Sequence, residues 1–205
     1  MKRSKMKPSI YRLSAFPLNL ILLPGEEIPL RIFEPRYKQL ITECLETKQS
    51  FGIPFLGENG MTEIGSEVVV TKLVGRNANE DMVISIKGIS LYKTIDFFPV
   101  LPDKLYGGTV SELLSIDFST TNPEVAVRVK ALKLNLSNEL GTLIVSDSIN
   151  MLDIARSLML KSEEKYKLLT LTSKVDKEQF IINQLRFMEL IRSQETKLEN
   201  NFSLN

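Results

Sequence analysis

The stretch FPLNLILLPGEEIPLRIFEPRYKQLITECL, residues 16–45, decides the fold. Residues 17–23 form an almost unbroken apolar run, which is typical of a strand that is covered on both faces. Pro24-Gly25 predicts a tight turn after it, because proline fixes φ and glycine tolerates positive φ. An extended piece, residues 29–33, follows, so the stretch reads as strand, turn and extended segment before a helix.

Pro35 fits the first position of that helix, where its missing N–H is not needed. Glu34 precedes a proline, and this disfavours helical conformation before Pro35. One apolar stripe at helical spacing contains Tyr37, Leu40, Ile41, Cys44 and Leu45. Cys44 lies on this stripe, so we interpret it as a small core residue and not as a reactive thiol.

Residues 51–114 contain short β-rich runs separated by turn signals. Asn59-Gly60 is such a signal, and residues 76–81 form a polar loop. Gly88 interrupts a strand pattern, which indicates a bulge or a close backbone approach. Several short strands at near-regular spacing favour a barrel or sandwich over a parallel sheet.

The pattern becomes helical after residue 120. Asn122 and Pro123 predict a cap and first position, with a helix extending to Gly141. Its stripe would consist of Val125, Val129, Leu132, Leu136 and Leu140. Further helices are predicted over 147–160, over 162–171 and from Asp176 onward. Stripes of this density indicate the core of a helical bundle.

Composition excludes several classes of protein. The 205 residues are 43% hydrophobic and 25% charged, as in ordinary globular proteins. Because the chain has no histidine, Ser-His-Asp catalysis and the usual zinc ligand sets are absent. No apolar run reaches the roughly 18 residues of a membrane span. A single cysteine allows no internal disulfide and favours a reducing compartment, so we expect a cytoplasmic protein without a membrane partner.

The first 13 residues carry five basic residues and no acid. Removing these five from the 26 basic residues leaves 21 against 25 acidic ones. A mildly acidic body is not the footprint of a nucleic-acid-binding face. We interpret residues 1–14 as a flexible basic arm, and not as a signal peptide, because prolines interrupt the apolar stretch that follows.

The opening stretch resembles the amino-terminal, substrate-binding domain of the Lon protease family. The matching pieces are Phe16-Pro17-Leu18, Pro24-Gly25, Pro29-Leu30 and Ile32-Phe33-Glu34-Pro35-Arg36-Tyr37. The run from Glu63 through Gly88 and Ile89 is also similar to that domain. Arg31 departs from the family, whose stand-alone members often carry histidine there.

The resemblance implies an α+β fold, with a six-stranded PUA-like β-barrel and one packed helix followed by a helical bundle. We expect the barrel over residues 15–118, the helical part over 119–200 and a polar tail over 201–205. The ATPase and Ser-Lys peptidase modules of full-length Lon have no counterpart here. The nearest match to a phosphate-binding loop, GMTEIGS at 60–66, has Ser-Glu where Lys-Ser/Thr is needed. We therefore expect a protein that is not an enzyme and uses no cofactor or metal.

The family's role implies binding of unfolded or tagged proteins or peptides, adaptor function in proteolysis, and a part in arranging a homo-oligomer. Binding of extended chain needs exposed apolar surface. The candidate binding residues are Pro24, Ile28, Pro29, Leu30, Arg31, Phe33, Arg36, Phe97 and Phe98. The residues expected to support the motif structurally are Phe16, Pro17, Gly25, Glu34, Pro35, Tyr37 and Gly88.

Two alternatives stay open at this point. PUA-like barrels in other families bind structured RNA, although the acidic body argues against that partner. Glu34 could form a partly buried ion pair with an arginine that fixes the turn into the helix, or Arg31 or Arg36 could contact a ligand. We favour the ion pair. For Phe33 and Phe98, core packing and ligand contact are equally compatible with the sequence.

Overall fold

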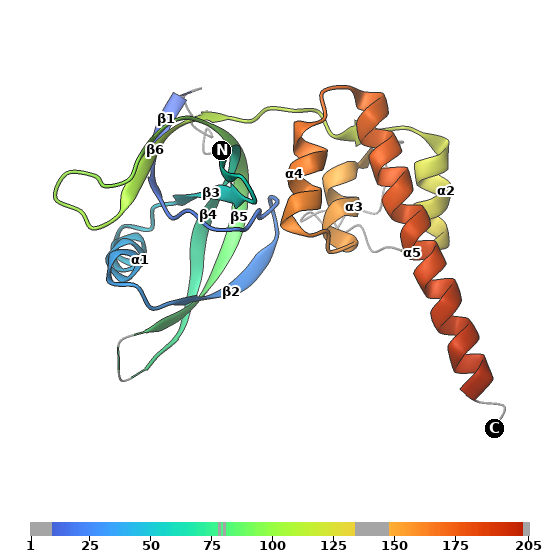
Figure 1. Cartoon of the computed structure of the whole chain (residues 1–205), viewed down its shortest axis with the longest axis horizontal. Helices are drawn as coiled ribbons and strands as arrows, with labels where there is room; N and C mark the ends of the chain where they lie inside the picture. The colour runs from blue at the N-terminus through green and yellow to red at the C-terminus, as the bar shows by residue number, and fades with distance from the viewer. Residues whose placement is uncertain (1–9, 78, 80, 134–147, 203–205) are drawn as a thin grey trace, which may run out of the picture. The chain divides into compact units, whose positions relative to one another are not determined.

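The computed structural model describes residues 10–77, 79, 81–133 and 148–202. The chain divides into two compact units, residues 1–115 and 116–205, and each is described by itself (Figure 1). The elements of the first unit are β1 (Ile10–Ala15), β2 (Glu27–Ile32), α1 (Pro35–Thr47), β3 (Phe51–Gly57), β4 (Gly60–Arg76), β5 (Met82–Phe98) and β6 (Gly107–Leu113).

The first unit contains one six-stranded sheet that closes on itself. Its strand order is β2-β5-β4-β3-β1-β6, and β5 also pairs with β6. Five strands therefore form a closed circuit, with β2 attached to the half of β5 that begins at Met82. The only parallel pairing between described strands joins β1 to β3 at Ala15 and Gly52.

Two strand edges lie outside this circuit. Among the described strands β2 pairs only with β5, and Glu26 accepts a backbone hydrogen bond from Gly88 at 2.9 Å. Backbone N–H groups point alternately to the two sides of a strand, and at Pro29 the nitrogen faces the unpaired edge of β2. Since proline has no N–H, this edge lacks a donor at that position. Beyond Val68, β4 has β5 on one side only, and two register shifts interrupt that pairing.

Helix α1 covers one face of this sheet. Pro35 occupies its first turn, and Lys48 ends it in the left-handed conformation at φ 56°. The predicted stripe is confirmed, since Tyr37, Leu40, Ile41 and Cys44 are buried. They pack in one core with residues of β2, β3, β4 and β5, including Ile32, Phe51, Ile53, Val68, Ile84 and Ile86.

The strand predicted over 17–23 is wrong. Only Leu18 forms an isolated bridge, to Phe55, and the rest of the segment is irregular. Ile21, Leu22 and Leu23 are nevertheless almost fully buried. The backbone N–H of Leu22 donates to the Ser66 hydroxyl at 2.9 Å, so a side chain supplies the partner that a neighbouring strand would have supplied. The apolar run reflects burial and not strand pairing.

Residues 10–14, which we expected in the basic arm, belong to β1. They pair residue by residue with β6, from Ile10 opposite Glu112 to Ser14 opposite Gly108. Leu13 and Ala15 are buried while Arg12 is exposed, which is the alternation of a half-buried strand. The remainder of the expected arm, residues 1–9, lies outside the described residues.

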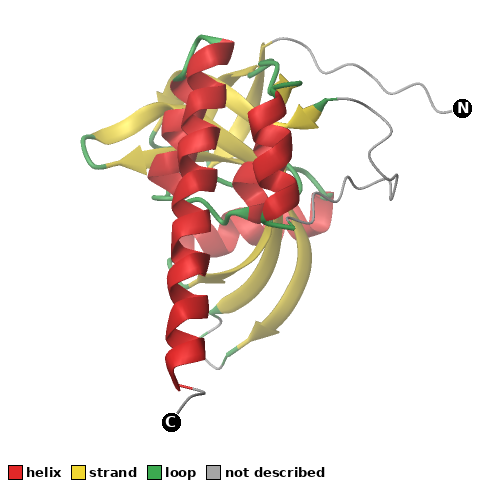
Figure 2. Ribbon diagram, turned by 90° about the vertical axis from the view of Figure 1, so that its right-hand side faces the viewer, coloured by secondary structure: helices red, strands yellow, loops and turns green. Residues whose placement is uncertain are grey.

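The second unit is mostly helical (Figure 2). Its elements are β7 (Ser119–Thr120), α2 (Pro123–Ala131), β8 (Ile149–Asn150), α3 (Met151–Ser157), α4 (Ser162–Thr170) and α5 (Lys174–Phe202). Asn122 caps α2, as predicted, by accepting a hydrogen bond from the N–H of Glu124 at 2.9 Å. The buried apolar residues of this unit include Val125, Val129, Ile154, Leu168, Ile181 and Leu185.

Three predicted helix limits are corrected in this unit. Helix α2 ends at Ala131. The later part of its predicted stripe, Leu136 and Leu140, and the glycine predicted just past its end, Gly141, lie outside the described residues. Helix α3 starts at Met151 and not at 147, because Asn150 caps it by accepting from the N–H of Leu152. Helix α5 extends through Phe202 into the expected polar tail.

Candidate functional site

A groove of about 370 Å³ lies at one end of the closed circuit of strands. Strands β1, β3 and β5 end there, while β4 and β6 begin there. Its lining consists of Ala15, Phe16, Pro17, Leu18, Glu34, Arg36, Tyr37, Leu56, Met61, Phe97, Pro99 and Gly107. The strand ends thus bring together side chains that are far apart in the sequence, and most of them are apolar.

One wall of the groove comes from the start of α1 and the segment before residue 20. The rings of Phe16 and Tyr37 stack with centroids 3.6 Å apart and an interplanar angle of 23°. The Arg36 guanidinium lies over the Tyr37 ring, 4.5 Å from its centroid. Burial raises the pKa of Tyr37, so its hydroxyl stays protonated near neutral pH. This wall combines an aromatic surface with a cation held against it.

Glu34 fixes the position of Arg36. The Nε of Arg36 donates to Glu34 Oε2 at 2.9 Å, and Nη2 donates to the same oxygen at 2.7 Å. The ion pair expected at the turn into α1 therefore exists, with Arg36 and not Arg31 as the cation. Its side chains are 51% and 39% exposed, so solvent screens the pair and its contribution to stability is small.

The opposite wall comes from the hairpin that joins β3 to β4 and from the end of β5. Leu56 and Met61 face each other across that hairpin. Met61 is 38% exposed, and Phe97 is partly exposed. Pro99 completes this wall, which contains no charged side chain. An apolar side chain entering the groove would contact aromatic, aliphatic and thioether groups here.

Only some of the predicted binding residues line this groove. Arg36 and Phe97 line the groove, together with the structural residues Phe16, Pro17, Glu34 and Tyr37. The other candidates, Pro24, Ile28, Pro29, Leu30, Arg31, Phe33 and Phe98, do not line it.

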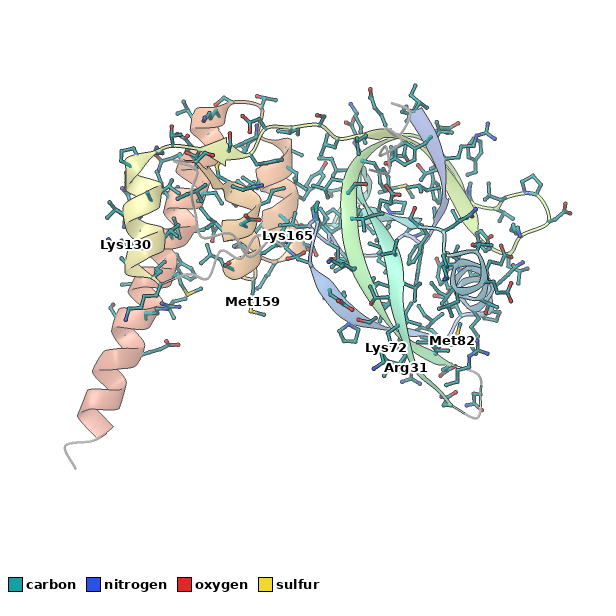
Figure 3. All side chains as sticks on the ribbon, turned by 180° about the vertical axis from the view of Figure 1, so that it is seen from behind. Arg31, Lys72, Met82, Lys130, Met159 and Lys165 are labelled. Atoms are coloured by element: carbon teal, nitrogen blue, oxygen red, sulfur yellow. The ribbon has the colours of Figure 1, made fainter. Side chains whose placement is uncertain are left out.

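These other candidates have partners or positions of their own. Ile28 and Leu30 pack against the core. Arg31 forms an ion pair with Asp81 at 2.9 Å, next to the turn between β4 and β5 (Figure 3). Phe33 is 61% exposed outside the groove, which excludes the core packing that the sequence left open.

Gly25 and Gly88 hold the segment that leads into the groove. Gly25 has a φ of 89°, which favours glycine, and its N–H donates to the Gly88 carbonyl at 2.9 Å. A Cβ on Gly88 would lie 2.5 Å from the Leu23 carbonyl oxygen. The close backbone approach predicted at Gly88 is confirmed, and it places residues 16–23 against the sheet.

Sequence reasoning missed Leu56, Met61 and Pro99. Leu56 and Met61 flank the predicted turn at Asn59-Gly60, which was a usable signal for a hairpin. Their convergence with Phe16 and Phe97 depends on pairing between distant strands, and no local pattern indicates it.

A buried carboxylate, Glu67, lies elsewhere in the circuit and is also unanticipated. It is fully buried and accepts hydrogen bonds from the hydroxyls of Ser50 and Ser90, both at 2.6 Å, and of Tyr11 at 3.3 Å. Burial and the charge of Glu67 raise the pKa of Tyr11 to about 12. These donors satisfy the carboxylate, so we assign it a structural role.

Within the described ranges, no three His, Cys, Asp or Glu side chains gather closely enough to hold a metal ion. No described helix is both long enough and apolar enough to cross a membrane.

Comparison with known proteins agrees with this arrangement. Residues 12–186 match the family described as ATP-dependent protease La (LON) substrate-binding domain. No curated protein sequence matches the chain. Among the solved structures that share the fold, two are Lon N-terminal domains.

The first of these is a Lon N-terminal domain protein from Xanthomonas campestris, with a TM-score of 0.64 and 20% identity. The alignment covers 84% of this chain and 98% of that one. The second is the N-terminal domain of Mycobacterium avium complex Lon protease, with a TM-score of 0.59 and 14% identity over 86% and 98% of the two chains. The family match covers most of the sequence, and the chain therefore belongs to the Lon substrate-binding domain family.

Proposed function

We propose that this protein is a non-catalytic binder of proteins, which takes extended apolar segments of unfolded or tagged chains into the groove beside Phe16 and Tyr37. One observation carries the proposal: Phe97 and Met61 leave partly exposed aromatic and thioether surface in a groove at the end of an otherwise well-packed sheet, where the nearly buried rings of Phe16 and Tyr37 also line it. Exposed apolar surface of this kind marks binding sites in soluble proteins. The family match supports substrate binding as the role of the domain.

The groove suits a segment that carries a large apolar side chain. Aromatic rings lie on one wall and Met61 on the other, and Met side chains adapt to ligands of varied shape. Arg36, already paired with Glu34, can still offer donors to a peptide carbonyl at the rim. With this lining, the groove would select a ligand by its apolar content and not by a particular sequence, which is what recognition of unfolded chains requires.

The test measures binding of a fluorescent, permanently unfolded protein by anisotropy. Phe97→Gln and Met61→Gln each remove apolar contact from the groove, and we expect about tenfold weaker binding, or about 1.4 kcal/mol. Met159→Gln is the matched control, because Met159 is 84% exposed after α3 and outside the groove (Figure 3). Equal binding by all three variants would contradict the groove as the site.

The remaining parts of the proposal follow from the same role. We propose that the protein acts as an adaptor in ATP-dependent proteolysis and has no catalytic activity of its own. Proteins are favoured over RNA as partners, because residues 14–205 carry more acids than bases. Cys44 is buried and unpaired, which supports a reducing cytoplasm. We propose that the closed sheet is of the PUA-like barrel type and that the helical unit is a bundle.

A further inference from the structure

A second groove, of about 590 Å³, lies on the other face of the same strand end. Phe97 lines the first groove and Phe98 lines the second, because successive side chains of a strand point to opposite faces. The second groove is lined by Arg12, Leu13, Ser14, Gln49, Ser50, Phe98, Leu101, Pro102, Lys104, Gly108 and Thr109. It differs from the first groove in that it contains two cations, Arg12 and Lys104, and more polar side chains.

The charges in this groove are not balanced. The Nζ of Lys104 donates to both carboxylate oxygens of Glu43, at 2.9 and 2.8 Å, so this cation is neutralised. Arg12 is exposed, and no side chain among the described residues forms an ion pair with it. Arg12 is therefore a charged side chain of the groove lining without an ion pair to any described residue, and its positive charge attracts an anionic group.

An apolar floor lies beside that charge. Phe98 is 40% exposed. Leu101 packs against Gly108, where an added Cβ would lie 2.8 Å from a Leu101 methyl group. A guanidinium next to such a floor suits an acidic side chain whose neighbours along the chain are apolar, because Arg binds carboxylates in a bidentate manner.

The two grooves are lined by consecutive residues at the end of β5. The Cα atoms of Phe97 and Phe98 are about 3.8 Å apart, and their side chains extend in opposite directions. An extended chain advances about 3.3 Å per residue, so a spacing of five residues corresponds to roughly 17 Å.

We propose that one extended segment of a client protein occupies both grooves, with an apolar side chain in the first and an acidic side chain on Arg12 in the second. This inference rests on the proposed function and names its substrate class, an apolar residue followed or preceded at short range by Asp or Glu. The charge of Arg12 selects this occupant. A second copy of the chain in this groove would appear as Arg12-dependent dimerisation in size-exclusion chromatography, and that outcome would overturn the proposal.

The test uses three fluorescent peptides with one Phe anchor and, five residues away, Glu, Gln or Lys. We expect the wild-type protein to bind the Glu peptide about fivefold to tenfold more tightly than the Gln peptide. Arg12→Gln removes this preference, and Arg12→Glu reverses it in favour of Lys. Lys72→Glu is the matched control, an exposed cation on β4 (Figure 3), and it leaves the preference unchanged.

The outcomes separate the two proposals. Equal affinity of the wild-type protein for the Glu and Gln peptides overturns the inference, while the proposed function stands because both peptides bind. Absence of binding by every peptide overturns the proposed function itself. An equal effect of Arg12→Glu and Lys72→Glu would indicate general charge attraction and would also overturn the inference. Since Arg12→Gln keeps a polar side chain of similar length, it supplies the test if the charge reversal prevents folding.

Discussion

Replacement of Gly88 by alanine tests how the segment before α1 is held against the sheet. The new Cβ would lie 2.5 Å from the Leu23 carbonyl oxygen and 3.2 Å from that of Leu22. Both neighbours are backbone atoms, so no side chain can rotate away. Ordinary contact begins at 3.4 Å, and the segment would have to move by about 0.9 Å.

This movement strains two hydrogen bonds, from Gly25 to Gly88 and from Gly88 to Glu26, both at 2.9 Å. Overpacking costs about 1–3 kcal/mol and each lost hydrogen bond about 1 kcal/mol, so we expect Gly88→Ala to destabilise the first unit by about 3 kcal/mol. For a unit of this size, that loss lowers the melting temperature by roughly 12 °C.

Near-UV circular dichroism is the suitable assay. The chain has no tryptophan and five tyrosines, of which only Tyr166 lies in the second unit, so the signal reports mainly on the first unit. Gly75→Ala is the control, because nothing lies within 4 Å of its Cβ position. We expect that variant to remain within about 1 kcal/mol of the parent. If Gly88→Ala were as stable as Gly75→Ala, our account of the close backbone approach would be refuted.

Three further predictions concern buried or paired groups. Hydrogen bonds from Lys104 and Tyr106 hold the pKa of Glu43 below its ordinary value. These interactions stabilise the fold at pH values above the ordinary carboxylate pKa, and their contribution is lost as the pH falls through the pKa of Glu43 in the folded protein. Glu43→Gln should therefore make the melting temperature fall less steeply as the pH is lowered. Burial raises the pKa of Cys44 to about 11, so iodoacetamide should modify it at pH 8 only after denaturation, and rapid labelling of the folded protein would contradict its position in the core. Tyr92 is buried, and none of the described residues forms a hydrogen bond with its hydroxyl. Tyr92→Phe should therefore leave stability unchanged or raise it by up to about 1 kcal/mol, and a clear loss in thermal denaturation would reveal a partner.

Patterns within a few neighbouring residues were enough to predict the helices that begin with a proline and carry an apolar stripe. Pro35 and the stripe from Tyr37 to Cys44 identified α1, and Asn122 with Pro123 identified the start of α2. The close backbone approach at Gly88 was predictable, because a glycine inside a strand usually marks one of a few features, and a close approach of another backbone is one of them.

Patterns of hydrophobicity failed where burial and pairing differ. Residues 17–23 are apolar because the core surrounds them, and the same composition would serve a paired strand equally well. Conversely, β1 was not predicted, because we interpreted the basic stretch that includes Arg12 as a flexible arm. The alternation of Leu13 and Ala15, both buried, with polar neighbours was the signal for a strand. Hydrophobicity alone cannot distinguish these cases.

The candidate site was predictable only in part. Phe16, Arg36, Tyr37 and Phe97 came from the motif or from exposed aromatic character. Met61 lies in the groove because the strands close into a circuit. That closure depends on pairing between distant strands, which local sequence patterns do not indicate. The buried Glu67 was unpredictable for the same reason, because its hydroxyl donors come from three different parts of the chain.

The two free strand edges have a consequence for how this protein tolerates the chains it is proposed to hold. A bare edge would recruit an unfolded client as an additional strand and so seed growth of an aggregate. Pro29 removes a donor from the edge of β2, and the register shifts near Lys72 and Val74 distort the edge of β4. A client can thus be held by its side chains and released again, since neither edge offers it a regular backbone template.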